Sequence, residues 1–219
     1  MPRLLANKNH PFDPVWHVQL AVLGALVLQV VLPDRFAANP KYLVAALEAA
    51  FLLLLAVTTP RLPEFTSVTR KANAIGLIAL IGASNIYSLV LVVGQLLSHT
   101  GVVSGTELII ASINIYATNI IIFGLLYWEL DGGGPGRRRG LAHHERDFLY
   151  PQTTLHTPAS QWHPTFIDYL YVSATNATAF SPTDTMPLTR RAKMLMLLQS
   201  LVSLTTLALV AARAVNILG

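Results

Sequence analysis

The sequence predicts an all-α integral membrane protein with five transmembrane helices. Of its 219 residues, 53% are hydrophobic and only 12% are charged, whereas a soluble domain carries about 25% charged residues. The mean hydropathy is +0.52, and the apolar residues gather in runs of about 18 or more, which is the length that crosses a bilayer. A soluble enzyme, a disordered tail and a nucleic-acid-binding module are therefore excluded.

Five apolar runs account for the predicted spans. They cover residues 15–32, 42–58, 73–97, 107–128 and 192–218, and each can cross about 30 Å of hydrocarbon at about 1.5 Å per residue. An odd number of spans places the two ends of this sequence on opposite sides. Four aromatic residues near the ends of these runs are expected at the membrane interface: Trp16, Tyr42, Tyr127 and Trp128.

The segment between the last two runs begins with a polar stretch. Residues 131–140 are rich in glycine and arginine, and they predict a flexible, solvated loop. His143, His144 and Glu145 follow, but neither they nor the other histidines have the spacing of metal ligands. With no cysteine in the chain, no metal site and no cofactor are predicted.

Residues 165–178 predict a helix that is too short to span a membrane, with Asp168 near its start, where a carboxylate suits the helix dipole. The polar residues 179–187 follow, and then the last apolar run. This order is typical of a re-entrant loop, whose irregular backbone must be buried by protein or line a water-filled cavity. The alternative is a short helix on the membrane interface with an exposed turn. The many hydroxyl groups of this segment would suit ion or water coordination.

The stretch from Ser173 to Thr189 resembles the pore helix, filter and filter exit of the tetrameric potassium-channel superfamily. An ungapped alignment places seven residues on positions that commonly carry the same residue type there: Leu170, Ser173, Ala177, Thr178, Asp184, Pro187 and Thr189. The resemblance implies a pore-like module, 105–219, after an N-terminal three-helix region, 1–104. Its parts would be an outer helix 107–128, a flexible basic loop 129–164, a pore helix 165–178 with Ser173 and Asn176, a filter-like loop 179–187 and an inner helix 192–218.

The centre of this motif departs from the family. Where potassium channels have Thr-Val-Gly-Tyr-Gly, this chain has Ala179, Phe180, Ser181, Pro182 and Thr183. The family's glycines let the backbone aim successive carbonyls at the ion, whereas proline fixes φ and removes a donor. We therefore expect a homotetramer that conducts monovalent or divalent cations with weak or non-potassium selectivity. Its ion pathway would run from Thr178 to Asp184, lined by side-chain oxygens.

The chain is also similar to an uncharacterised bacterial five-span membrane family, which is a domain of unknown function. The similarity lies in the span layout, in Asp-Tyr-Leu-Tyr-Val-Ser at 168–173, in Asp184 followed by Arg190 and Arg191, and in Ala-Val-Asn at 214–216. It implies a multi-pass protein of the cell inner (plasma) membrane, with the lipid bilayer as its surroundings.

Three polar residues within the apolar runs give further hypotheses. Glu48 lies in the middle of the second run, where an acid is costly and functional by default. It is the candidate titratable site of a small proton-coupled transporter, and the alternative is a protonated Glu48 hydrogen-bonded to a neighbour such as Asn85. Asn114 and Asn119 are five residues apart, so they do not share a helix stripe, and we expect them to join helices.

No paired carboxylates, His–Ser pair or metal spacing indicates an enzyme. A non-conducting membrane assembly protein remains the third hypothesis. Twelve of the 15 Lys and Arg residues fall on the side of the N-terminus and the filter mouth, which the positive-inside rule places in the cytoplasm. In potassium channels the filter mouth faces outward, so the charge bias and the resemblance disagree on orientation.

Overall fold

The computed structural model describes residues 15–38, 40–58, 68–97, 104–138, 141–154, 162–179 and 184–218. These residues are mostly helical, as predicted. They form α1 (Val15–Val31), α2 (Lys41–Thr58), α3 (Val68–Leu97), α4 (Gly105–Leu130), α5 (Phe166–Ala179) and α6 (Arg190–Leu218). The helices α3, α4 and α6 are long and apolar enough to cross a membrane, and α1 and α2 contain shorter apolar helices, Trp16–Val31 and Tyr42–Leu53. The protein is thus a helical membrane protein by length and composition.

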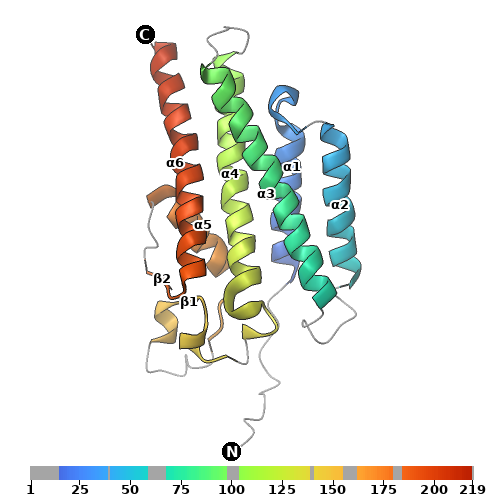
Figure 1. Cartoon of the computed structure of the whole chain (residues 1–219), viewed down its shortest axis with the longest axis vertical. Helices are drawn as coiled ribbons and strands as arrows, with labels where there is room; N and C mark the ends of the chain where they lie inside the picture. Colours follow the sequence, from blue (N-terminus) through green and yellow to red (C-terminus); the bar gives the residue numbers. More distant parts are fainter. Residues whose placement is uncertain are drawn as a thin grey trace, which may run out of the picture.

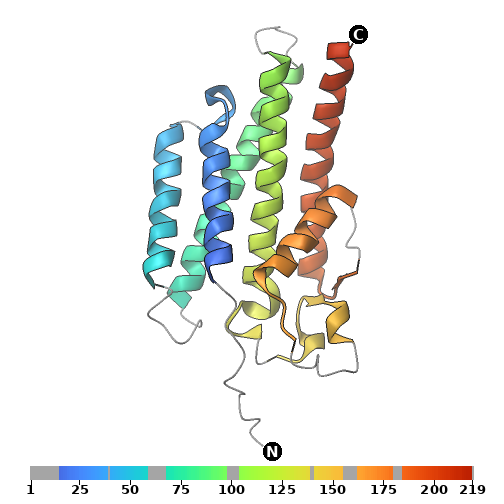
Figure 2. The same ribbon diagram turned by 180° about the vertical axis from the view of Figure 1, so that it is seen from behind.

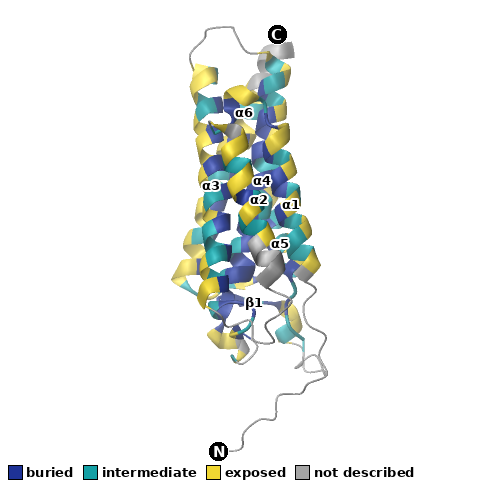
Figure 3. Cartoon of the chain, turned by 90° about the vertical axis from the view of Figure 1, so that its right-hand side faces the viewer, coloured by how far each residue is buried: buried dark blue, intermediate teal, exposed yellow. Residues whose placement is uncertain are grey.

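The long helices lie side by side in a bundle in which α1 to α4 alternate in direction (Figure 1). Buried residues face the inside of the bundle and exposed residues lie along its outer surface (Figure 3). Of the three long helices, α4 is the most buried and α6 the least. The central helix α4 contacts α1, α3, α5 and α6. These four helices therefore pack directly on α4.

The helix ends have local causes. Ser104 caps α4, because its Oγ accepts a hydrogen bond from the Glu107 backbone N–H at 3.1 Å. Asp168 accepts the Thr165 backbone N–H at 2.7 Å and so closes the first turn of α5. The helix α3 begins at Val68, five residues before the predicted span, because its first turn has tertiary partners that are described below.

One end of the bundle carries a compact polar structure, which we call the cap and define as residues 131–138, 141–154 and 184–189. It contains the 3-10 turns Asp131–Gly133, His143–Glu145 and Pro151–Thr153 and the strands β1 (Phe148–Leu149) and β2 (Met186–Pro187). The prediction of a solvated loop over residues 131–140 is wrong for its described part, because Asp131 is fully buried and Arg138 is 4% exposed. Gly132, Gly133 and Gly134 have positive φ, so these three glycines form a tight turn at the end of α4.

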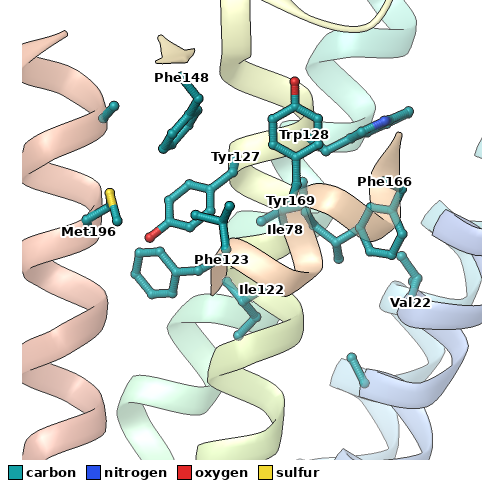
Figure 4. Packing of buried hydrophobic residues seen from close by; sticks show 14 of the residues in the cluster. Val22, Ile78, Ile122, Phe123, Tyr127, Trp128, Phe148, Phe166, Tyr169 and Met196 are labelled. Carbon is teal, nitrogen blue, oxygen red and sulfur yellow. The ribbon is translucent and has the colours of Figure 1, made fainter. Parts of the chain in front are cut away.

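The aromatic core joins this cap to the helices (Figure 4). Tyr127 lies 5.1 Å from Phe148 between ring centroids, Phe148 lies 6.2 Å from Tyr169, and Trp128 lies 6.4 Å from Phe166. Tyr127 and Trp128 are therefore buried, and their expected place at a lipid interface is wrong. The cap covers the end of α4, and that cover removes both rings from the surface.

Candidate functional site

The short helix α5 packs between α4 and α6. Its 14 residues begin near the cap end of α4 and cross obliquely toward α6 (Figure 2). Gly124 of α4 allows the close approach, because a Cβ built at this position would lie 3.2 Å from the Cα of Leu170. The hydroxyl of Ser173 donates to the Ile120 carbonyl oxygen of α4 at 2.7 Å.

The segments on both sides of α5 meet at the same end of the bundle. Strands β1 and β2 pair antiparallel, with Phe148 opposite Pro187 and Leu149 opposite Met186. The Leu188 backbone N–H adds a bond of 2.8 Å to the Asp147 carbonyl oxygen. The chain that leads to α5 and the chain that leaves it toward α6 are therefore tied together within the cap.

The buried face of α5 is held by a polar network centred on Gln199 of α6. The Oε1 atom of Gln199 accepts hydrogen bonds from the Tyr127 hydroxyl at 2.6 Å and from the Asn176 amide at 2.9 Å. Its Nε2 atom donates to the hydroxyl of Ser173 at 2.6 Å and to the Ser173 carbonyl oxygen at 2.9 Å. Every donor and acceptor site of the Gln199 amide is thus used, and Ser173 and Asn176 both point at α6.

Sequence reasoning selected Ser173 and Asn176 and missed Gln199. The only available signal was an uncharged amide in an otherwise apolar run, which does not indicate a partner. Asn114 and Asn119 behave as predicted, because Asn114 donates to the Leu28 carbonyl oxygen of α1 at 2.6 Å and Asn119 donates to the hydroxyl of Ser203 in α6 at 2.9 Å. Each joins α4 to a different helix.

Of the candidate ion-pathway residues, two lie at the C-terminal end of α5 and one, Asp184, lies at the start of the cap segment 184–189. Thr178 and Ala179 form the last turn of α5 and are exposed, and the Thr178 hydroxyl bonds to the Ala174 carbonyl oxygen of its own helix at 2.9 Å. Asp184, where the described chain resumes, is also exposed. The remaining four residues lie outside the described residues: Phe180, Ser181, Pro182 and Thr183.

Glu48 lies in α2 and is fully buried. Neither of its carboxyl oxygens has a hydrogen-bond partner within the described part of the chain. The expected bond to Asn85 does not form, because the Asn85 amide donates to the Ile115 carbonyl oxygen of α4 at 3.3 Å. The neighbouring polar side chain is Gln29 of α1, whose amide donates to the Ser84 hydroxyl of α3 at 2.8 Å.

A second polar cluster, which sequence reasoning missed, joins the cap to the ends of α3 and α4. Arg70 of α3 forms a buried ion pair of 2.7 Å with Glu129 of α4. The ammonium of Lys71 donates to the Gly133 carbonyl oxygen at 2.8 Å, and the Arg138 guanidinium lies 5.5 Å from the centre of the Trp128 ring. These contacts account for the early start of α3.

The cap also binds the first turn of α6 and the body of α5. Asp131 accepts the Asp147 backbone N–H at 2.7 Å and the Tyr169 hydroxyl at 2.5 Å. Asp147 in turn pairs with Arg191 and accepts the Thr189 hydroxyl. Burial lowers the pKa of the Arg146 guanidinium and raises the pKa of the Tyr150 hydroxyl well above its ordinary value. Within the described ranges, no group of three acidic or histidine side chains could hold a metal ion.

The helices and their buried polar contacts define the chain as a helical membrane protein in which a short helix is held between two long ones. No protein-family model matches this sequence, and no curated protein and no solved structure matches it. Its function is therefore argued from its own residues.

Proposed function

We propose that the chain is a pore-loop ion-channel-like membrane protein that assembles as a homotetramer and conducts small cations with weak or non-potassium selectivity. The observation that carries this proposal is the position of α5 between α4 and α6, with its flanking segments tied together by β1 and β2. A pore helix must be held by an outer and an inner helix, and it must deliver its C-terminal end to the ion pathway.

The charge at the end of α5 supports conduction of cations. The C-terminal end of a helix carries a partial negative charge, and Asp184 follows it in the chain. The buried face of α5 is occupied by Gln199, while Thr178 and Ala179 stay exposed in the single chain. Four copies meeting at this exposed end would bring four helix ends, and the four Asp184 residues that follow them in the chain, around one axis.

The proposed protein crosses the cell inner (plasma) membrane five times, with α1 and α2 completing the spans of α3, α4 and α6, and with α5 in a re-entrant hairpin. Several of the described basic residues lie at the cap end, including Arg70, Lys71, Arg138, Arg146 and Arg191, whereas Arg35 and Lys41 lie at the other end. The positive-inside rule therefore supports a cytoplasmic cap. In that orientation the filter mouth is inverted relative to potassium channels.

The test uses the absence of cysteine from the chain. Purified Ser181→Cys protein is reconstituted in liposomes, and K⁺ and Na⁺ flux is measured before and after a thiol-reactive methanethiosulfonate reagent. The proposal expects flux through the unmodified protein and block by the reagent in Ser181→Cys alone. The matched control is His144→Cys, which is exposed on the cap and should react without block.

Two results contradict the channel. One is the absence of cation flux from correctly folded, reconstituted protein, which favours the non-conducting assembly protein. The other is a monomer in native mass spectrometry of the protein in lipid nanodiscs, because one copy of the hairpin cannot enclose a pathway.

A proton-coupled transporter is the second candidate, and the unpartnered carboxyl of Glu48 favours it. A buried acid without a counter-charge is costly in hydrocarbon, and a bound proton removes that cost. Transport driven by a pH gradient should then be abolished by Glu48→Gln and be insensitive to modification at Ser181→Cys. The channel requires the opposite pattern.

A further inference from the structure

A groove of about 390 Å³ lies on the surface of the bundle between α5 and α6. Its wall contains the apolar side chains of Met196, Leu197, Leu201 and Leu204, and one of its ends contains Lys193. From residue 193 to residue 204 the helix rises about 16 Å, which is about half of a hydrocarbon core of about 30 Å. The groove therefore has the length of one membrane leaflet.

The wall of the groove is apolar. Leu197, Leu201 and Leu204 are each about half exposed and lie on one stripe of α6. The two uncharged polar residues of the lining are already bonded within the bundle, because Asn176 donates to the Met196 carbonyl oxygen at 3.0 Å and accepts the Ser200 hydroxyl at 3.4 Å. An occupant consequently meets methyl and methylene groups along the wall.

The end of the groove offers a positive charge. Lys193 lies in the first turn of α6 and is exposed, and its ammonium has no carboxylate partner among the described residues. The neighbouring Arg191, by contrast, is paired with Asp147. Arg190 is also exposed but does not line the groove, so the charge that the groove offers to an anion is that of Lys193.

We propose that this groove binds an anionic phospholipid, with one acyl chain along Leu197, Leu201 and Leu204 and its phosphate at Lys193. The apolar wall favours a lipid over free phosphate, and the unpaired ammonium favours an anionic lipid over a zwitterionic one. The cap end carries several of the basic residues, and the cytoplasmic leaflet that such an end faces contains the anionic lipids. This site requires neither conduction nor a tetramer.

The test compares phosphatidylglycerol with phosphatidylcholine of the same acyl chains. Each lipid is titrated into the delipidated full-length protein in detergent, and binding is measured by native mass spectrometry and by the increase in Tm. We expect one phosphatidylglycerol per chain, bound about fivefold more tightly than phosphatidylcholine, because one lysine near the headgroup contributes about that factor. Equal binding of the two lipids would overturn the proposal.

Two pairs of variants separate the headgroup site from the groove. Lys193→Gln should remove the fivefold preference, whereas Arg190→Gln, which changes the same charge outside the groove lining, should keep it. Leu201→Trp should fill the groove and weaken both lipids, whereas Leu198→Trp, at an exposed position that does not line the groove, should not. Equal losses within either pair would show a general surface effect and contradict the site.

Two further measurements would reveal an occupant other than a lipid. Inorganic phosphate at millimolar concentration should not displace the lipid, and complete displacement would assign Lys193 to free phosphate. Leu201→Cys should form no disulfide-linked dimer in liposomes that contain phosphatidylglycerol. An efficient crosslink between two copies would show that a second chain fills the groove and would overturn the lipid assignment.

Discussion

Asn176 of α5 and Gln199 of α6 are joined by a buried hydrogen bond of 2.9 Å between the Asn176 amide and the Gln199 Oε1 atom. The same Gln199 side chain also bonds to Ser173 and Tyr127, so one residue of the last helix holds the short helix against the bundle. Gln199 therefore makes three of the hydrogen bonds that hold α5, beside those of Ser173 to Ile120, Asn176 to Met196 and Tyr169 to Asp131.

Replacing Gln199 with methionine should lower the free energy of unfolding by about 2 kcal/mol. The change removes four hydrogen bonds, and each such bond between membrane helices contributes about 0.6 kcal/mol. Unfolding in mixed micelles with increasing sodium dodecyl sulfate measures the loss. The control is Thr205→Val, because the Thr205 hydroxyl is exposed and bonds only within α6. Equal effects of the two variants would contradict the role of Gln199.

Gly124→Ala and Gly94→Ala should change stability in opposite directions. At Gly124 the new Cβ would lie 3.2 Å from the Cα of Leu170, so α5 must shift, at a cost of about 1–3 kcal/mol. At Gly94 nothing lies within 4 Å of the new Cβ, and alanine favours a helix over glycine by up to about 1 kcal/mol. Thermal unfolding of the two variants in the same detergent checks the signs. A gain of stability in Gly124→Ala would show that α5 does not pack closely on α4.

The buried pair of Arg70 and Glu129 should behave non-additively. Removing one partner leaves a buried charge that has lost its ion-pair partner and costs about 3–5 kcal/mol, whereas removing both leaves neither charge of the pair. Arg70→Met and Glu129→Leu should therefore each destabilise the protein more than the double variant does. A double-mutant cycle on the free energy of unfolding measures the coupling, and a double variant with the sum of the two single losses would contradict it.

Tyr150→Phe should leave stability nearly unchanged at neutral pH and improve it above pH 10. The Tyr150 hydroxyl is buried without a hydrogen-bond partner in the described structure, so its removal leaves no group unsatisfied. Burial raises the pKa of Tyr150 in the folded protein, while the unfolded chain has the ordinary pKa of about 10. Above pH 10 the unfolded chain therefore loses this proton first, and the parent loses stability as the pH rises.

The measurement for Tyr150→Phe is the Tm from pH 8 to pH 12. The parent should lose more Tm than the variant above pH 10. The matched control is Tyr87→Phe, because Tyr87 is about half exposed on α3, and its Tm profile should follow the parent. An identical alkaline profile in the parent and Tyr150→Phe would contradict the burial of this hydroxyl.

The helices could be predicted from the sequence because lipid requires long apolar runs with few interruptions. The ends of α5 were also predictable, since Asp168 closes its first turn through a contact within three residues. Patterns of this kind involve only residues that are close together in the sequence, so they can be recognised without the structure. They located five of the six described helix starts within two residues, and α3 is the exception.

The cap could not be predicted, because its partners are distant in the sequence. Arg70 and Glu129 are 59 residues apart, and Lys71 and Gly133 are 62 residues apart. Glycine and arginine next to each other normally indicate a solvated loop, and nothing local shows that Arg70 and Lys71 of α3 bind the Glu129 carboxylate and the Gly133 carbonyl oxygen. Gln199 was missed for the same reason, because a lone amide in an apolar run carries no sign of the residues that it will bind.

The order of the network along the chain has a consequence for how the protein is made. Asn176 and the cap residue Asp147 both depend on partners that follow them, namely Gln199 and Arg191. While the ribosome is still synthesising α6, α5 has its contacts with α4 but lacks the residues that bind its polar face. The bonds of α5 to Gln199 can therefore form only after α6 has been synthesised. A chain truncated before residue 199 would leave the Asn176 amide without its Gln199 partner.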